Sequence, residues 1–433
     1  MRQPIASFVL LTVLHVATPV SALPTVYLVE TSPTTAAQSA SSEFPLFERG
    51  LIALDKNDLQ QAEKLFRQAI EKDPKSPKPL LGLAETARRR GQTGEAERWV
   101  AKAAEVAPND PDSQLAMGRL LFAKRKYAEA EASFLKAAAG NPDAAAPWID
   151  LGELYNQQGK PERAGEAFGK AIRLKPEHAG AHYGAGMAYL ARRDFLSATP
   201  LLEKATRLAP DNPLAWMALS QVLAAQRKYK DALVAAEKAT QRQPGMISAQ
   251  FNLADVALSA GQPRLAVSAL HDAARIAPKS AQIPLKLGML HQQAGEWKEA
   301  YLAYEHAIRL DPKLALAYNN LAWIAAERKE RLDDALRWSQ KAIEIAPQEV
   351  GFKDTLAWVK RARGDLPGAI RLLEQVTAEK SASAEHFYHL GIARSDAGQK
   401  AGAIDALRKA LQVDPGFPQA GDASRRLNEL AAR

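Results

Sequence analysis

Cysteine is absent from all 433 residues of this sequence. The chain therefore forms no disulfide, and no cysteine is available to carry a lipid at a signal cleavage site. The absence fits an oxidising compartment without requiring one. Nothing in the cysteine count points to a redox function.

Signals for catalysis are also absent. The sequence has no glycine-rich phosphate loop and no nucleophile elbow. His386 and His389 stand three residues apart on one predicted helix, a spacing that could hold a metal ion, but no cysteine and no evident third ligand accompanies them. We therefore expect structural histidines, no enzyme activity, no catalytic residue, no bound metal and no small-molecule cofactor.

Proline, in contrast, recurs at a fixed interval of 34 residues. Because proline removes a backbone donor and fixes φ, it ends a helix and starts the link to the next one. A period of this size predicts a repeat solenoid instead of a globular domain. The eight prolines are Pro74, Pro108, Pro142, Pro176, Pro210, Pro244, Pro278 and Pro312.

One copy of the period, residues 145–178, shows the pattern in full. Its marker residues are Trp148, Leu151, Gly152, Tyr155, Ala164, Phe168, Ala171 and Pro176. This spacing resembles the tetratricopeptide repeat family, in which each repeat is a helix–turn–helix unit. Eleven copies in phase cover residues 43–417. The resemblance implies an all-α fold: a right-handed α-solenoid, or superhelix, of about eleven repeats.

Two positions of the repeat test this division of the chain into 34-residue copies. The twentieth position is alanine in every copy, as expected where two helices cross closely. The fifteenth position, which ends the first helix, is mostly glycine, with Asn57 in the first copy. Gly and Asn tolerate the left-handed conformation that closes a helix. We expect strained or altered turns where Arg125, Arg193, Arg227 and Lys329 replace glycine.

Short segments flank the repeats. Residues 1–22 are predicted to be a secretory signal with an apolar core at Ile5–Val16 and a small-residue cleavage site at Val20-Ser21-Ala22. The rival interpretation keeps the segment as an anchor extending to Val29. Residues 23–42 are expected to be a flexible tether rich in Ser, Thr and Ala. Residues 418–433 are expected to form a C-terminal capping helix opened by Asp422 as its N-cap.

The formal net charge is +8, and many basic residues fall near positions 12–18 of their repeats. Equal positions stack in a solenoid, so these residues would form a basic edge. The edge could attract an anionic polysaccharide, lipid headgroups or an acidic protein. It could equally reflect cations placed at helix C-termini, where the helix dipole favours them. No interleaved aromatic residues indicate nucleic-acid binding. The edge is represented by Arg88, Arg89, Arg90, Arg227 and Lys228.

The resemblance implies that the first helices of the repeats line a concave groove. At the fifth position an apolar ladder runs through successive copies, and it either anchors a partner or only packs against neighbouring helices. The asparagine ladder of some family members is broken here, and the lysine, asparagine and arginine clamp for a terminal carboxylate is missing. The predicted groove residues are Leu115, Asp150, Tyr183, Met217, Phe251, Asn252, Asn320 and Trp323.

Together these features predict a non-enzymatic protein-interaction scaffold, exported to the periplasm or cell envelope of a bacterium. The expected partner is a peptide or helical segment of another protein bound in the groove. By resemblance, envelope-complex assembly or exopolysaccharide export is the expected pathway. The alternative is direct binding of an anionic polysaccharide or a membrane surface by the basic edge.

Overall fold

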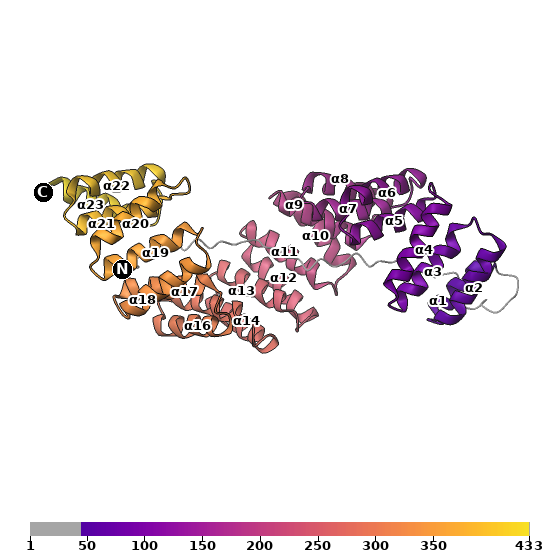
Figure 1. Ribbon diagram of the computed structural model, residues 1–433, viewed down its shortest axis with the longest axis horizontal. Coiled ribbons are helices and arrows are strands. Elements are labelled where there is room, and N and C mark those ends of the chain that lie inside the picture. Colours follow the sequence, from indigo (N-terminus) through magenta and orange to yellow (C-terminus); the bar gives the residue numbers. More distant parts are fainter. Residues whose placement is uncertain (1–44, 433) are drawn as a thin grey trace. The chain divides into compact units, whose positions relative to one another are not determined.

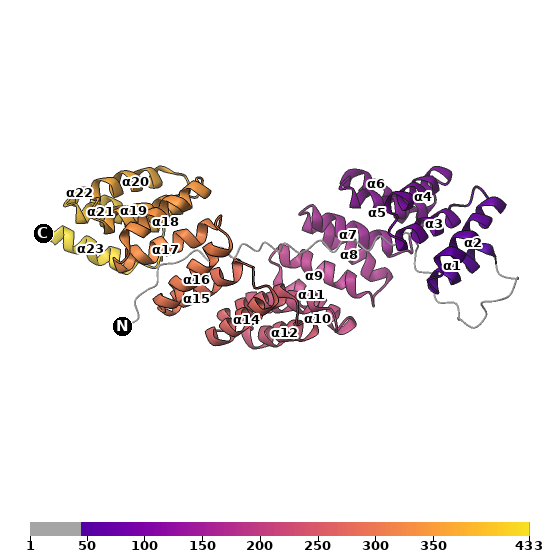
Figure 2. The same ribbon diagram turned by 60° about the horizontal axis from the view of Figure 1, so that its bottom comes forward.

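The computed structural model describes residues 45–432, all of whose regular structure is helical, without a strand (Figures 1 and 2). The all-α solenoid expected from the sequence is confirmed. The predicted signal and tether at residues 1–42 lie outside the described residues. Between residues 45 and 432 no helix has the length and apolar content needed to cross a membrane.

The helices divide into two compact units, with the division between Pro244 and Gly245. The described part of the first unit contains α1 (Leu46–Asp55), α2 (Leu59–Lys72), α3 (Pro77–Arg89), α4 (Thr93–Val106), α5 (Pro111–Ala123), α6 (Tyr127–Gly140), α7 (Ala146–Gln157), α8 (Pro161–Leu174), α9 (Ala179–Ala191), α10 (Phe195–Leu208), α11 (Pro213–Ala225) and α12 (Tyr229–Arg242). Each helix packs against the next, and the odd-numbered helices also contact one another in succession.

The second unit repeats this arrangement. It contains α13 (Ile247–Ser259), α14 (Pro263–Ile276), α15 (Gln282–Ala294), α16 (Trp297–Leu310), α17 (Ala315–Arg328), α18 (Leu332–Ile345), α19 (Val350–Ala362), α20 (Leu366–Ala378), α21 (Ala384–Asp396), α22 (Lys400–Val413) and α23 (Ala420–Ala432). Here α17, α19 and α21 form the row of first helices that contact one another.

Small residues let the two helices of each pair approach closely. The alanines at the twentieth position are at most 1 % exposed: Ala62, Ala96, Ala130, Ala164, Ala198, Ala232, Ala266, Ala300, Ala335, Ala369 and Ala403. A glycine sixteen residues before a buried aromatic has a matching role. A methyl group added at Gly152 would lie 2.7 Å from the ring of Phe168, and one added at Gly288 would lie 2.6 Å from the ring of Tyr304. The aromatic ring fills the space that the missing side chain leaves.

The turns within the pairs adopt the left-handed conformation that the sequence predicted. Gly91 and Gly159 have φ of 74° and 66°, and Arg125 has φ of 58°. A non-glycine residue in this region is strained because its Cβ approaches the following carbonyl oxygen. Lys329 and Arg331 also have positive φ, at 54° and 48°, in the turn between α17 and α18.

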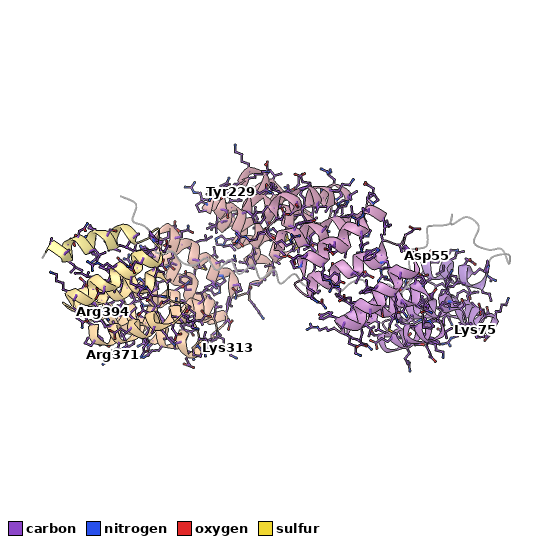
Figure 3. The ribbon with its side chains drawn as sticks, turned by 90° about the horizontal axis from the view of Figure 1, so that it is seen from above. Asp55, Lys75, Tyr229, Lys313, Arg371 and Arg394 are labelled. Atoms are coloured by element: carbon purple, nitrogen blue, oxygen red, sulfur yellow. The ribbon has the colours of Figure 1, made fainter. Side chains whose placement is uncertain are left out.

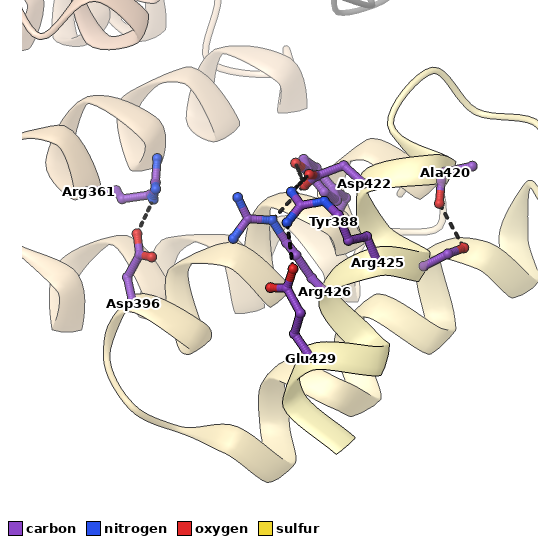
Figure 4. Close-up of polar contacts among 9 residues, drawn as sticks. Arg361, Tyr388, Asp396, Ala420, Asp422, Arg425, Arg426 and Glu429 are labelled. Atoms are coloured by element: carbon purple, nitrogen blue, oxygen red, sulfur yellow. Dashed lines mark hydrogen bonds and ion pairs between the residues drawn. The ribbon is translucent and has the colours of Figure 1, made fainter. Parts of the chain in front are cut away.

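The last helix, α23, covers the end of the second unit, but it begins earlier than expected. It starts at Ala420, so Asp422 lies in its first turn and is not the N-cap. The Asp422 carboxylate instead accepts hydrogen bonds from the hydroxyl of Tyr388, at 2.7 Å, and from Nε of Arg426, at 2.6 Å (Figure 4). Leu427 and Leu430 pack on the buried cluster below.

Candidate interaction surfaces

In the first unit, the predicted groove residues lie on successive first helices. Leu115 is on α5, Asp150 on α7, Tyr183 on α9 and Met217 on α11. Leu115 is 4 % exposed and belongs to the hydrophobic core around Phe134. Tyr183 and Met217 are half-buried, so part of each side chain faces solvent. The side chains open to a partner here are therefore Tyr183 and Met217, while Leu115 packs internally.

Asp150 is also committed to the interior. It is 2 % exposed, and its Oδ2 lies 2.6 Å from Nε of Arg119 on α5. Burial raises the pKa of Asp150, and the Arg119 guanidinium opposes that rise without cancelling it. This ion pair joins two neighbouring first helices, which makes Asp150 a structural residue of the groove wall.

One turn further along α7, Glu153 lies near enough to Tyr183 of α9 for its charge to act on the pKa of the tyrosine. Burial raises the pKa of the half-buried Glu153, and the nearby Asp150 carboxylate raises it further. Burial, followed by the Glu153 charge, raises the pKa of Tyr183 to about 12. Within residues 45–432 neither the Glu153 carboxylate nor the Tyr183 hydroxyl has a hydrogen-bond partner. A donor brought by a partner would satisfy both groups.

In the second unit, the predicted residues separate into exposed and buried members. Phe251 on α13 is half-buried, with Nζ of Lys286 5.5 Å from its ring centroid. Asn252 is 6 % exposed and Asn320 is fully buried. The Asn320 amide donates to the Tyr304 hydroxyl at 3.2 Å, inside the eighth and ninth helix pairs. Both asparagines are therefore buried by the folded chain.

Trp323 on α17 belongs to an aromatic cluster that extends over α19 and α21. Its ring stacks on Trp358 with centroids 5.9 Å apart and an interplanar angle of 13°. The His389 ring lies 4.4 Å from the Trp358 ring. Trp358 Nε1 donates to Glu327. The sequence identified Trp323 but not this cluster, whose members recur at intervals of 31–35 residues, about one repeat.

The two neighbouring histidines on α21 have separate structural roles. His386 Nδ1 accepts the backbone N–H of Ser383 at 3.0 Å and so caps the helix. His389 Nδ1 pairs with Oδ2 of Asp354 on α19 at 2.8 Å, and both residues are buried. Between residues 45 and 432, no group of three or more His, Cys, Asp or Glu residues is arranged to hold a metal ion.

The basic edge is largely neutralised by ion pairs. Arg88 and Arg89 both contact Glu85 on their own helix, at 2.6 and 3.0 Å. Arg90 contacts Glu63 of the preceding repeat at 2.5 Å. Burial disfavours the Glu85 charge, but the two guanidiniums outweigh burial and lower its pKa. Arg90, through Glu63, and Arg89, through the Leu54 carbonyl oxygen, link the first two repeats, whereas the Arg88–Glu85 pair lies within α3.

Similar pairs link many successive repeats. Each joins a basic residue to an acidic residue roughly one period away. Examples within the first unit are Lys124–Glu97, Arg163–Glu131, Arg192–Glu162, Lys204–Glu177 and Arg242–Asp211; those within the second are Lys286–Asp255, Arg331–Glu305, Arg361–Asp396 and Arg363–Asp333. Arg227 and Lys228 are exposed and have no ion pair among the described residues.

Comparison with known proteins assigns the family. Two family models, both described as tetratricopeptide repeat, match the chain. One matches residues 53–120, and the other matches residues 115–179, 157–213, 183–247, 217–281, 251–313, 285–350 and 355–426. The matches cover well over half of the sequence. The chain belongs to the tetratricopeptide repeat family, whose members are generally non-enzymatic scaffolds for protein–protein interaction.

Solved structures with the same type of fold share little sequence with this chain. The Cut9–Hcn1 hetero-tetramer of the APC/C is 14 % identical, with a TM-score of 0.44, covering 87 % of this chain and 95 % of that one. Yeast Tom70 is 15 % identical, with a TM-score of 0.45 and coverage of 89 % and 95 %. A tetratricopeptide repeat protein of Parabacteroides merdae is 19 % identical, with a TM-score of 0.48 and coverage of 59 % and 99 %. No curated protein matches the chain significantly.

Proposed function

We propose that this protein is an exported, non-enzymatic scaffold of the bacterial cell envelope that binds a segment of another protein on the first helices of its repeats. The interaction role in general follows from the family. The envelope location rests on the predicted signal at residues 1–22. A role in assembly of an envelope complex or in exopolysaccharide export rests on resemblance to other exported bacterial proteins of this family.

One observation carries the binding role. Glu153 and Tyr183 are partly desolvated in the first unit, yet neither has a hydrogen-bond partner among the described residues. The oxygen atoms of both side chains still reach solvent, so hydrogen-bonding groups of a partner can replace the water there. Met187 and Met217 lie half-buried on α9 and α11 and provide adaptable apolar contact area. This combination fits a peptide segment that brings both an apolar side chain and a hydrogen-bond donor.

Site-specific photo-cross-linking tests the position of the partner. A photoreactive phenylalanine analogue replaces Tyr183 in the native host, and the same analogue replaces Val234, which is 52 % exposed on α12, as a control. We expect one discrete adduct at position 183 and none at position 234. Equal labelling at both positions would contradict binding along the first helices.

Export is tested separately. Fractionation of the host followed by N-terminal sequencing should recover a mature chain that begins at Leu23. An intact chain beginning at Met1 in the cytoplasm would overturn the envelope location and leave the groove proposal standing.

A further inference from the structure

Two turns between paired helices in the described part of the first unit carry cations that form no ion pair there, although other residues of the same repeats are paired. Arg193 follows α9, and Arg227 and Lys228 follow α11, with Lys230 one residue into the first turn of α12. All four side chains are exposed, and none forms an ion pair among residues 45–432. At the turn of Arg125 the neighbours Lys124 and Lys126 pair with glutamates, and at the turn of Arg193 the neighbour Arg192 does. Among these three turns only the one at Arg227 and Lys228 has no paired cation within residues 45–432. We call Arg193, Arg227, Lys228 and Lys230 the cationic patch.

Hydrogen bonds bring the two parts of the patch together. Nε2 of Gln226 donates to the backbone oxygen of Phe195 and to the Thr199 hydroxyl, both at 2.8 Å. The turn that carries Arg227 and Lys228 is therefore fixed against the start of α10, and Phe195 is only two residues after Arg193. Figure 3 labels Tyr229, the residue after Lys228 and the first residue of α12.

An unusually exposed leucine lies in the same place. Leu196, the second residue of α10, is 84 % exposed, far more than Leu135 at 42 % or Val234 at 52 %. It directly follows Phe195, the residue to which Gln226 is bonded. The surface thus combines four unpaired cations with an apolar side chain that the folded chain does not use.

The two turns of the patch share the backbone of the other non-glycine turns. Arg193 and Arg227 have φ of 59° and 60°, the left-handed region in which glycine is relaxed and arginine is strained. Arg125 has φ of 58°, so the turn of the repeat imposes this conformation and the conformation does not distinguish the patch.

The acidic residues beside the patch are occupied. Asp194 caps α10 by accepting the N–H of Ser197 at 3.1 Å and its hydroxyl at 2.8 Å. Asp231 lies in the first turn of α12, where a carboxylate is stabilised by the helix dipole. Arg192 is paired with Glu162 and adds no free charge. The patch keeps an excess of positive charge.

We propose that the cationic patch and Leu196 dock this protein on the surface of an anionic lipid bilayer. The four cations would contact headgroup phosphates, and Leu196 would enter the boundary between headgroups and acyl chains. Basic residues beside an anionic membrane and apolar side chains buried at its interface act together in surface binding. A soluble polyanion would use the cations but would give Leu196 no apolar environment. This surface is separate from the groove around Tyr183.

Vesicle co-sedimentation of the full chain tests the proposal. Vesicles of phosphatidylcholine alone are compared with vesicles containing phosphatidylglycerol, so that any charge-independent binding is subtracted. Phosphatidylglycerol should increase vesicle binding of the native chain. We expect this increase to be more than tenfold smaller in the R193Q/R227Q/K228Q variant, because each basic residue near an anionic surface contributes about fivefold to partitioning. Glutamine keeps a side chain of similar reach and retains the left-handed turn strain.

Matched variants separate the patch from general charge. The K64Q/K136Q/R207Q variant removes three exposed cations of the same unit that also have no ion pair among the described residues. It should change the increase in binding caused by phosphatidylglycerol by less than threefold. Leu196→Ser should reduce binding roughly fivefold, while Leu135→Ser should not.

Two results would overturn the proposal. An equal loss in both triple variants would mean that net charge alone governs binding. Loss in R193Q/R227Q/K228Q with no effect of Leu196→Ser, together with equally reduced binding of dextran sulfate, would reassign the patch to a soluble polyanion. Circular dichroism of each variant, expected to be unchanged, shows that the fold is intact.

Discussion

Oδ2 of Asp354 lies 2.8 Å from Nδ1 of His389, and this pair joins α19 to α21 in the second unit. Asp354 is 5 % exposed and His389 is 6 % exposed. Burial alone would lower the pKa of His389, but the Asp354 carboxylate outweighs burial and raises it, with smaller contributions from Glu385 and Glu327. The last two helix pairs are therefore joined by a titratable bond.

The first prediction concerns alkaline pH. Because the folded pKa of His389 lies above its ordinary value of 6.5, the pair stabilises the protein fully below that value. The stabilisation is lost as pH rises through the folded pKa. Hydrogen exchange of the α21 amides, corrected for the intrinsic rate, should accelerate above pH 6.5 in the native chain. His389→Gln should remove that pH dependence; an unchanged profile in this variant would contradict the assignment.

The second prediction concerns acidic pH at the same helix. Burial lowers the pKa of His386, whose neutral Nδ1 accepts the Ser383 N–H. The stabilisation from His386 is therefore present above its ordinary value of 6.5 and is lost as pH falls towards the folded pKa. Exchange at the start of α21 should accelerate as pH falls below 6.5. His386→Gln should remove the acceleration of exchange below pH 6.5 and leave the acceleration above pH 6.5 unchanged.

The third prediction concerns the helix crossings. Ala130 is 0 % exposed, whereas Ala132 on the same helix is exposed. Ala130→Leu should destabilise the first unit by about 1–3 kcal/mol because the added methyl groups overpack the crossing. Ala132→Leu should change stability by less than about 0.5 kcal/mol. Urea unfolding compares the two variants, and equal midpoints would count against close packing at Ala130. Ala164→Leu and Ala232→Leu should behave like Ala130→Leu, since both alanines are also 0 % exposed.

The fourth prediction concerns the strained turns. Arg125 has φ of 58° and no ion pair among the described residues. Arg125→Gly should stabilise the first unit by about 0.5–1 kcal/mol, because relief of the left-handed strain exceeds the added entropy of the unfolded chain. Gly159→Ala, at φ of 66°, should destabilise by a similar amount. Thermal unfolding of both variants checks the opposite signs, and a loss of stability in Arg125→Gly would refute this account.

The fifth prediction concerns binding once a partner is identified. If the half-buried rings anchor the partner, Tyr183→Ala or Phe251→Ala should each weaken binding by about 1–2 kcal/mol, mainly through faster dissociation. The affinity should depend little on salt, because apolar contacts are not screened. Surface plasmon resonance at two salt concentrations measures both quantities. A steep salt dependence with no effect of either substitution would exclude these anchors.

The repeat architecture could be predicted from the sequence because it is imposed locally and many times over. The 34-residue proline period, the alanine of the twentieth position and the small residue that closes each first helix are set by packing and backbone geometry within one helix pair. Even the turns that depart from the pattern, such as Arg125, keep the predicted left-handed backbone.

The surfaces were less predictable because they depend on contacts between repeats. Asp150 and Asn320 occupy positions that face the groove in the family, yet the chain buries them against Arg119 and Tyr304. Asp422 misses its expected capping position because α23 starts at Ala420, three residues before a helix capped by Asp422 would start.

The sequence by itself determined the all-α repeat fold and the position of each residue within its 34-residue repeat. Only the tertiary structure decided which charges are neutralised. Arg90 meets Glu63, 27 residues away, whereas Arg227 meets no acid among the described residues. The physical reason is that the position of a residue in its repeat fixes only where its side chain starts. The partner of that side chain depends on which side chains of a neighbouring repeat come within about 4 Å.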